Sequence, residues 1–191
     1  MADTSKVTIF VVGPSKVGKT AICNYIAELS DSINSSEYHP TQGVRILEFD
    51  RKIVSDGKTH KWKELNLEVE LWDCSGDSEF HSCWPVVSTQ IQGVLFVTSP
   101  DLKQDRELDL WPDLFPAIKS NQCAVFAHRL VNSSSKSKVK MIHKTLIKAP
   151  LFYTSLDQDP EAIRDGFDLL LINVYAAMME TKEKEEKSIA G

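Results

Sequence analysis

The sequence predicts an α/β fold in which helices cover both faces of a largely parallel sheet, giving three layers. Short runs rich in β-branched and aromatic residues recur along the chain. The first, at 6–12, is almost unbroken, as in strands buried on both faces. Helical spacing of apolar residues follows such runs, and alternation of strands with helices favours a layered α/β sandwich. The 191 residues suffice for one domain with a core and are too few for two ordinary domains.

In the first half of the chain, the run at 6–12 stops at Gly13, and a helix is expected from near Lys19. Polar residues at 30–43 then indicate a loop. Segment 44–54 reads as a strand, and 65–71 reads as another in which apolar and acidic or amide residues alternate. The Asp-Gly turn at 55–58 predicts that these two strands pair as an antiparallel hairpin, with the second at or near a sheet edge.

The second half offers three more strand candidates, at 93–99, 122–128 and, more weakly, 151–156. A helix-like segment at 102–119 contains Pro112 and Pro116, which should break or kink it.

The last helix is predicted to run from about Pro160 to Glu180, with Asp159 as its N-cap. Residues 1–180 are therefore expected to form one domain. The charged segment 181–191 is expected to be a tail, either a frayed helix end or disordered.

Composition excludes several classes of protein. A formal charge of −5 argues against a generally basic surface for nucleic acid. No apolar run approaches the length of a membrane helix, and no signal peptide is apparent. Ala2 and the cysteine-free end 188–191 offer no lipid site, so we expect no direct lipid anchor. The four scattered cysteines lack metal-site spacing and indicate reduced thiols of a cytoplasmic protein without zinc.

The strongest motif is the segment Gly13-Pro-Ser-Lys-Val-Gly-Lys19-Thr20, a complete G-x-x-x-x-G-K-[ST] phosphate loop. Its glycines allow backbone N–H groups to point at a phosphate, and the following helix presents its positive end. Lys19 can then contact the β- and γ-phosphates, and the Thr20 hydroxyl can ligate Mg²⁺. The motif needs a buried strand before it and a helix after it, and both are predicted.

Three residues farther along complete a joint pattern. Thr41 lies in the loop after the first helix. Asp73 ends the alternating strand, where a carboxylate can hold Mg²⁺ through water. Gly76 follows in an Asp-x-x-Gly sequence and can offer its N–H to a γ-phosphate. Each fragment is weak alone, but their order and spacing are rarely met by chance.

With these motifs the chain resembles the Ras-like small GTPases, especially Rab-type members, over nearly its whole length. The matching segments are 13–20, 38–41, 72–77 and, faintly, 153–157. More narrowly, 38–50, 70–85 and the strand at 123–128 resemble the Rab-like subunits of the intraflagellar transport B complex.

This resemblance implies a six-stranded nucleotide-binding fold, GTP or GDP with Mg²⁺ as ligands, and a place among the other subunits of that complex. It also implies location in the cytoplasm, at the cilium or flagellum and at its base, for a chain expected to be monomeric alone. The implied metal residues are Thr20, Thr41 and Asp73. The implied nucleotide residues are Gly13, Ser15, Lys16, Val17, Gly18, Lys19, Thr20, Ala21, Gly76, His128, Arg129, Ser155 and Leu156.

Two departures from the family pattern matter. Asp77 stands where Ras-like hydrolases carry the Gln that orients water, so we expect slow hydrolysis. The guanine-reading N-K-x-D appears as His128-Arg129-Leu130-Val131, and Val131 cannot accept the guanine hydrogen bonds. Arg129 can lay its planar group over a purine. The equally weighted alternative is that His128 and Arg129 are ordinary exposed loop residues.

Three functional interpretations remain open at this stage. The leading one is an interaction module whose loops at 36–44 and 74–86 are ordered by bound triphosphate and Mg²⁺. Trp84 is expected to help form its nucleotide-sensitive surface. The second is an active GTPase switch, and the third, a small P-loop kinase, lacks an arginine-bearing lid. The acid-free basic stretch 129–148 is either a solvated lysine face or a dock for an acidic partner.

Overall fold

A computed structural model describes residues 5–29, 40–54, 64–84, 90–102, 105–131, 133 and 137–189. Its centre is a six-stranded sheet with the strand order β2-β3-β1-β4-β5-β6. The strands are β1 (Ser5–Val12), β2 (Val44–Val54), β3 (Glu64–Cys74), β4 (Gly93–Thr98), β5 (Cys123–Arg129) and β6 (Leu151–Ser155). β2 and β3 are antiparallel, whereas all other neighbours are parallel. The predicted mostly parallel sheet with one antiparallel pair is confirmed, and the predicted turn at 55–58 lies outside the described residues.

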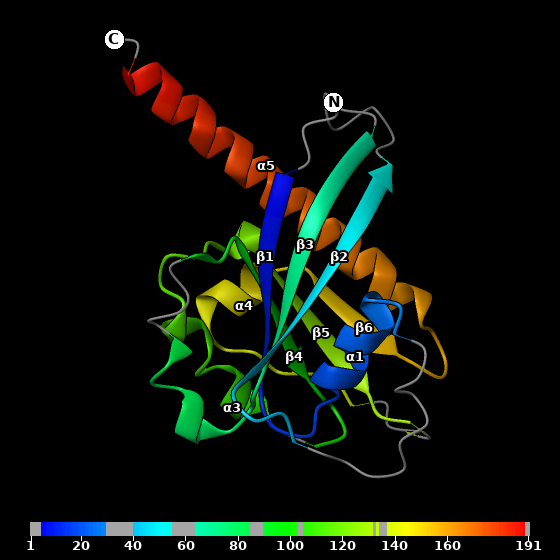
Figure 1. Cartoon of the computed structure of the whole chain (residues 1–191). Coiled ribbons are helices and arrows are strands. Elements are labelled where there is room, and N and C mark those ends of the chain that lie inside the picture. Colours follow the sequence, from blue (N-terminus) through cyan, green and yellow to red (C-terminus); the bar gives the residue numbers. More distant parts are fainter. Residues whose placement is uncertain are drawn as a thin grey trace.

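Helices cover both faces of this sheet (Figure 1). On one face, α1 (Lys19–Ile26) and α5 (Glu161–Ile189) bury apolar side chains against Val7, Ile9 and Val11 of β1. On the other, α3 (Asp105–Leu108) and α4 (Lys144–Lys148) pack over Phe10 and Val12. Because successive side chains of a strand point to opposite faces, an unbroken apolar strand such as β1 can serve both cores.

The segment predicted as a broken helix at 102–119 is indeed interrupted. The four-residue helix α3 is followed by a 3-10 helix, Pro112–Leu114, which carries its proline at the first turn. Trp111 and Phe115 are buried in the core on this side of the sheet. Proline ends a regular helix because it lacks the backbone N–H, so the apolar side chains here are buried by short turns instead.

The last helix extends farther than the sequence suggested. α5 continues past Glu180 to Ile189, and Figure 1 shows its final turns projecting beyond the sheet. Of the two alternatives for this segment, a helix end or disorder, the structure has the helix over 181–189, where it is exposed. Glu180 and Lys184 stand four residues apart, a spacing of glutamate and lysine that favours an exposed helix.

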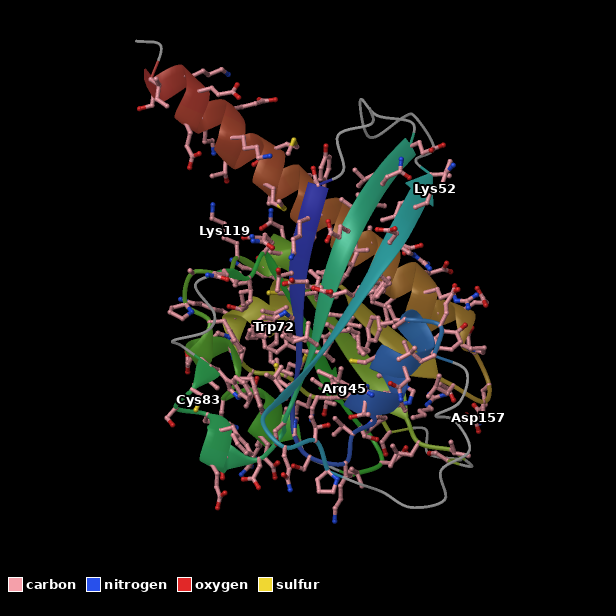
Figure 2. All side chains as sticks on the ribbon, in the orientation of Figure 1. Arg45, Lys52, Trp72, Cys83, Lys119 and Asp157 are labelled. Carbon is pink, nitrogen blue, oxygen red and sulfur yellow. The ribbon has the colours of Figure 1, made fainter. Side chains whose placement is uncertain are left out.

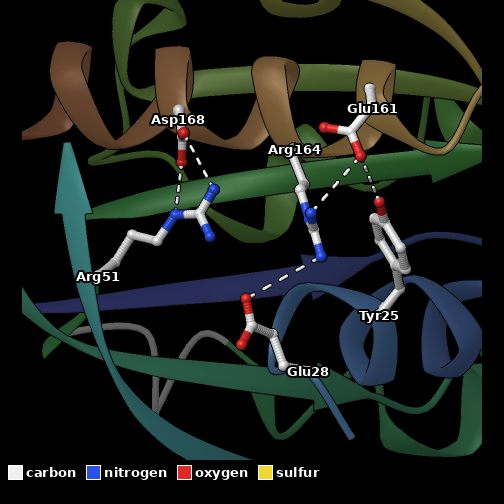
Figure 3. Close-up of polar contacts among 6 residues, drawn as sticks. All are labelled: Tyr25, Glu28, Arg51, Glu161, Arg164 and Asp168. Atoms are coloured by element: carbon white, nitrogen blue, oxygen red, sulfur yellow. Dashed lines mark hydrogen bonds and ion pairs between the residues drawn. The ribbon is translucent and has the colours of Figure 1, made fainter. Parts of the chain in front are cut away.

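Polar contacts join α1, β2 and α5 on their shared side of the sheet (Figure 3). Arg51 of β2 donates two hydrogen bonds to the Asp168 carboxylate of α5, at 2.9 and 3.0 Å. Tyr25 of α1 donates to Glu161 at 3.3 Å, and the Arg164 guanidinium lies 4.8 Å from the centroid of the Tyr25 ring. These contacts hold the edge strand and the first helix against α5.

No helix among the described residues is both long enough and apolar enough to span a bilayer.

Candidate functional site

The candidate site lies at the edge of the sheet where its parallel strands end. The phosphate loop follows β1, Asp73 is next to last in β3, His128 and Arg129 end β5, and Ser155 ends β6. In open α/β sheets this edge is where ligands bind, because the loops that leave the strand ends surround a common crevice. The topology therefore gathers the motif residues, which are far apart in sequence, at one end of the molecule.

The loop between β1 and α1 has the backbone shape that its glycines allow. Gly13, Lys16 and Gly18 have positive φ angles of 142°, 68° and 93°. A Cβ on Gly13 would lie 2.0 Å from the backbone oxygen of Val97, and one on Gly18 would lie 2.8 Å from the His128 ring. Both positions therefore exclude larger residues, and the chain curls tightly into the N-terminus of α1, whose first turn carries no acidic residue.

The Lys19 side chain folds back onto the first residues of this loop. Its ammonium donates to the carbonyl oxygens of Gly13 at 2.9 Å and Pro14 at 2.8 Å. The side chain is almost fully buried, and this burial lowers its pKa to about 8, with partial opposition from the Asp73 charge. An ammonium has three N–H donors, so the third can reach an anion in the loop.

Thr20, Thr41 and Asp73 come together in space as the sequence predicts. The Thr20 and Thr41 hydroxyl oxygens are 3.0 Å apart, and the Thr41 hydroxyl donates to Oδ2 of Asp73 at 3.5 Å. Asp73 is fully buried, and this burial raises its pKa, while the hydrogen bonds and Arg45 oppose the rise. Its Oδ1 has no hydrogen-bond partner in the part of the chain that the structure describes.

This donor set fits Mg²⁺. Two hydroxyls and a carboxylate are the hard oxygen ligands that Mg²⁺ prefers, and the unpartnered buried oxygen of Asp73 is a group that a hydrated cation would satisfy. Thr20 and Thr41 would contribute hydroxyls, Asp73 would act directly or through water, and the ion would neutralise phosphate charge.

Gly76 lies directly against the phosphate loop. A Cβ on this residue would fall 2.5 Å from the Ser15 backbone nitrogen and 2.7 Å from the Gly13 backbone oxygen. Next to it, the Ser75 N–H donates to the Gly43 carbonyl at 2.8 Å. The segment after β3 and the segment before β2 are thus tied to each other beside the loop, so a ligand that moved one would move the other.

Asp77 is exposed, and its carboxylate is occupied locally. Oδ1 accepts a hydrogen bond from the Glu79 N–H at 3.0 Å and so caps the short 3-10 helix Ser78–Phe80. A carboxylate engaged with its own backbone is poorly suited to hold an attacking water, since it can accept hydrogen bonds but cannot donate one to a phosphate oxygen.

Trp84 differs from its predicted role. Only 3% of it is exposed, and it packs with Phe10 and Phe80 in the core on the α3 and α4 side of the sheet. The hypothesis that it forms part of a surface is therefore wrong. Because its ring packs between Phe80 of the segment after β3 and Phe10 of β1, Trp84 anchors that segment to the core.

The base end of the site is the part where the resemblance places the guanine base, at residues 128–131 and 155–156. Here His128 is buried rather than exposed. Its ring lies against Gly18, and Nδ1 shares a 3.1 Å hydrogen bond with the Thr154 hydroxyl. Burial lowers the pKa of His128 to about 4, so the ring is neutral at physiological pH. The interpretation of His128 as an ordinary exposed loop residue is thus wrong, and the ring instead supports the phosphate loop.

The other base-end residues are also engaged within the chain. The Arg129 guanidinium lies 5.9 Å from the centroid of the Tyr153 ring, while Val131 is 66% exposed. The Ser155 hydroxyl donates to the Asp157 carboxylate, and Leu156 packs partly into the core. Arg129, Ser155 and Leu156 therefore have contacts within the fold, although the buried Nε of Arg129 has no hydrogen-bond partner among the described residues.

Two features of the site escaped the sequence analysis. Arg45 of β2 contacts the Asp73 carboxylate and also donates to Asn24 of α1 at 2.5 Å. Asp101, after β4, accepts from the Leu130 N–H at 3.0 Å and the Ser133 hydroxyl at 2.6 Å, and so ties these two residues to the end of β4. Figure 2 labels Arg45 beside α1. Arg45 was missed because a single arginine in a strand belongs to no known motif. The signal that could have found it is the register of the β2–β3 hairpin, which places Arg45 opposite Asp73.

Comparisons with known proteins agree with this geometry. The family model for the Ras of Complex (Roc) domain of DAPkinase matches residues 8–133. Intraflagellar transport protein 22 homologs of Danio rerio and Homo sapiens are each 37% identical over 188 residues, covering 96% of this chain and 98% of the relative. Intraflagellar transport protein 22 of Trypanosoma brucei brucei is 27% identical over 202 residues, covering 94% of this chain and 90% of the relative.

A Ras-like GTPase domain implies binding of a guanine nucleotide, typically with Mg²⁺. The phosphate loop fits the phosphates of such a nucleotide, and the Asp73 cluster fits the ion. The match spans the phosphate loop, Thr41, Asp73 and Gly76, and at the base end it includes His128 and Arg129. The chain belongs to the intraflagellar transport protein 22 family of Ras-like GTPase-domain proteins.

Proposed function

We propose that the chain is a GTP-binding, Rab-like subunit of the intraflagellar transport B particle that acts as a nucleotide-dependent interaction module. The names of its relatives associate them with intraflagellar transport. Bound GTP and Mg²⁺ would order the two loop regions at 36–44 and 74–86, and the ordered surface would dock on other subunits of the particle. Residues 36–39 and 85–86 of these regions lie outside the described structure.

One observation carries this proposal: three separate segments converge on one point. Thr20 of the phosphate loop, Thr41 before β2 and Asp73 at the end of β3 are linked by their hydroxyl and carboxylate oxygens at 3.0 and 3.5 Å. A hydrated Mg²⁺ bound to a triphosphate would engage all three at once. The loops would therefore be held in one arrangement with GTP and released without it.

An exposed apolar surface continues from this point along the edge strand. Val44 is 38% and Ile46 is 46% exposed, and both lie in the first three residues of β2, which begins three residues after Thr41. Exposed apolar side chains beside loops that respond to a ligand are suited to a protein partner, because docking removes them from water. We propose that the chain is monomeric alone and reaches the cilium or flagellum through such contacts.

Slow hydrolysis belongs to the same proposal. In the resemblance, Asp77 takes the sequence position of the water-positioning Gln, and the engagement of its carboxylate as a helix cap supports slow hydrolysis. The nucleotide would then serve mainly as a structural ligand. An active switch would need a water-positioning group supplied by a partner.

The test mixes the purified full-length chain with reconstituted intraflagellar transport B subunits and measures co-elution by size exclusion. The chain is loaded with GTP and Mg²⁺, with GDP and Mg²⁺, or stripped of nucleotide. We expect the GTP form to co-elute most and Thr41→Ala to lose the difference between GTP and GDP, whereas Thr41→Ser keeps it. Equal co-elution of all three forms would contradict the proposal.

A further inference from the structure

Arg45 places a positive charge beside Asp73, one of the residues that would hold Mg²⁺. Arg45 and Asp73 face each other across β2 and β3 as a register pair. Nη2 of Arg45 lies 3.3 Å from Oδ2 of Asp73, and the same nitrogen donates to Asn24 of α1. Asp73 is fully buried, whereas 39% of the Arg45 side chain is exposed. The guanidinium therefore approaches the buried carboxylate from β2, the edge strand of the sheet.

The two oxygens of Asp73 have different surroundings. Oδ2 receives both Arg45 and Thr41, while Oδ1 has no partner among the described residues. Arg45 thus occupies one oxygen and leaves the other available. A buried carboxylate beside a phosphate loop would repel a polyphosphate unless a cation compensated for its charge. A divalent ion supplies one such compensation, and Arg45 supplies another that never dissociates.

We propose that Arg45 is a permanent counter-ion of Asp73, which makes retention of the nucleotide less dependent on Mg²⁺. The inference rests on the proposed nucleotide site and adds a residue that no motif of the site contains. Without Mg²⁺, the guanidinium offsets the repulsion between Asp73 and the phosphates. With Mg²⁺ bound, the ion performs most of that compensation, so the arginine matters less.

A second arginine of the same strand shows what a purely structural pair looks like here. Arg51 binds Asp168 of α5 through Nε at 2.9 Å and Nη2 at 3.0 Å, in the two-pronged geometry of a strong structural pair (Figure 3). Arg45 instead contacts Asp73 through one nitrogen, and its buried Nε has no partner in the described part of the chain. Its geometry is that of a charge placed near a carboxylate rather than of a bidentate clamp.

The experiment measures how fast a fluorescent GDP analogue leaves the full-length chain after excess unlabelled GDP is added. The release rate is measured in millimolar Mg²⁺ and again in EDTA. The rate in EDTA divided by the rate in Mg²⁺ reports how strongly retention depends on Mg²⁺. We expect Arg45→Gln to raise this ratio about three- to fivefold, mainly through faster release in EDTA, the scale of one partly screened charge pair. Arg45→Lys, which keeps the charge, should stay near the wild-type ratio.

Arg51→Gln is the matched control. It removes an arginine–carboxylate pair from the same strand, so it should lower the melting temperature and leave the ratio unchanged. Arg45→Met, which keeps the length of the side chain without its charge, should repeat the result of Arg45→Gln if that variant folds poorly.

An unchanged or lower ratio in both uncharged variants would overturn the inference, as would an equal rise in Arg51→Gln. If the wild-type chain retained no GDP analogue in either condition, the proposed nucleotide function would fall together with the inference. Retention by the wild type with no effect at Arg45 would overturn the inference alone.

Discussion

The phosphate end and the base end of the site differ in how closely they follow the family pattern. At the phosphate end, Gly13, Lys19 and Thr20 stand in a complete motif, and the structure brings Thr41 and Asp73 to the same point. At the base end, the positions that read guanine hold other residues: His128 and Arg129 contact other side chains of the protein, and Val131 is exposed.

The difference shows that the two ends depend on different kinds of group. The phosphate end combines backbone geometry, which glycine and a helix terminus supply, with side chains of a motif of fixed spacing. The base end would use side-chain pairing, which one substitution removes. Here His128 packs beneath Gly18, so a position of the base motif supports the phosphate loop instead. The predictions below separate the two ends.

The largest effect is expected from Lys19→Ala. Removing the buried ammonium eliminates a charge-assisted contact with phosphate and should weaken GTP binding on the order of 100-fold. Isothermal titration or fluorescence competition measures the loss. Lys148→Ala, which removes an exposed lysine of α4, should bind like the wild type. A loss of less than about threefold at Lys19 would mean that the phosphate end is misassigned.

His128 predicts a pH-dependent stability. Its folded pKa of about 4 lies below the ordinary value of 6.5, so the unfolded chain takes up a proton that the folded chain refuses. Stability contributed by the neutral ring is therefore present above pH 6.5 and is lost as pH falls toward 4.

Urea unfolding should show that this histidine accounts for about 2 kcal/mol of the loss in unfolding free energy between pH 7 and pH 5. His128→Asn, which cannot take up that proton, should lose correspondingly less over the same range. If both proteins lost the same amount, the ring would not be buried beneath Gly18 as described.

Base discrimination should respond to Val131→Asp. Because Val131 is 66% exposed, a carboxylate there has little burial cost and can accept the two hydrogen bonds of guanine. We expect the preference for GTP over ATP, measured by competition, to rise about tenfold. Val131→Asn, which has nearly the same shape without the charge, should change it much less. An unchanged preference in Val131→Asp would place the guanine edge elsewhere.

The smallest effect on affinity is expected from Asp77→Gln. The side chain is exposed and caps a 3-10 helix, so its replacement should alter local order by about 1 kcal/mol and leave GTP affinity within about twofold. Single-turnover assays should find slow hydrolysis in the wild type. A large loss of affinity would show that Asp77 lies closer to the phosphates than its capping contact indicates.

Much of the fold could be predicted because local pattern and packing agree. The predicted strand at 44–54 coincides with β2, since the polar segment before it and the predicted Asp-Gly turn after it mark its two ends. α4 was missed because five residues with two lysines show no helical period. The length of α5 was underestimated because charged composition alone resembles disorder, whereas residues four apart pair along the helix.

The site was predictable where chemistry is carried by a motif and not where it arises from contacts between distant elements. The phosphate loop was found directly, because its glycines and lysine have fixed spacing. Arg45 was missed because its meaning depends on facing Asp73 across the sheet. The burial of His128 was equally hidden, since a sequence does not say whether the last residue of a strand turns inward or toward solvent.

As proposed, the chain holds a guanine nucleotide as a structural ligand. The nucleotide that co-purifies with the full-length protein, released by heat and identified by chromatography and mass, tests it most directly. We predict bound GTP. Bound GDP would indicate an active hydrolytic switch, and a protein free of nucleotide that also fails to bind added GTP would contradict the account.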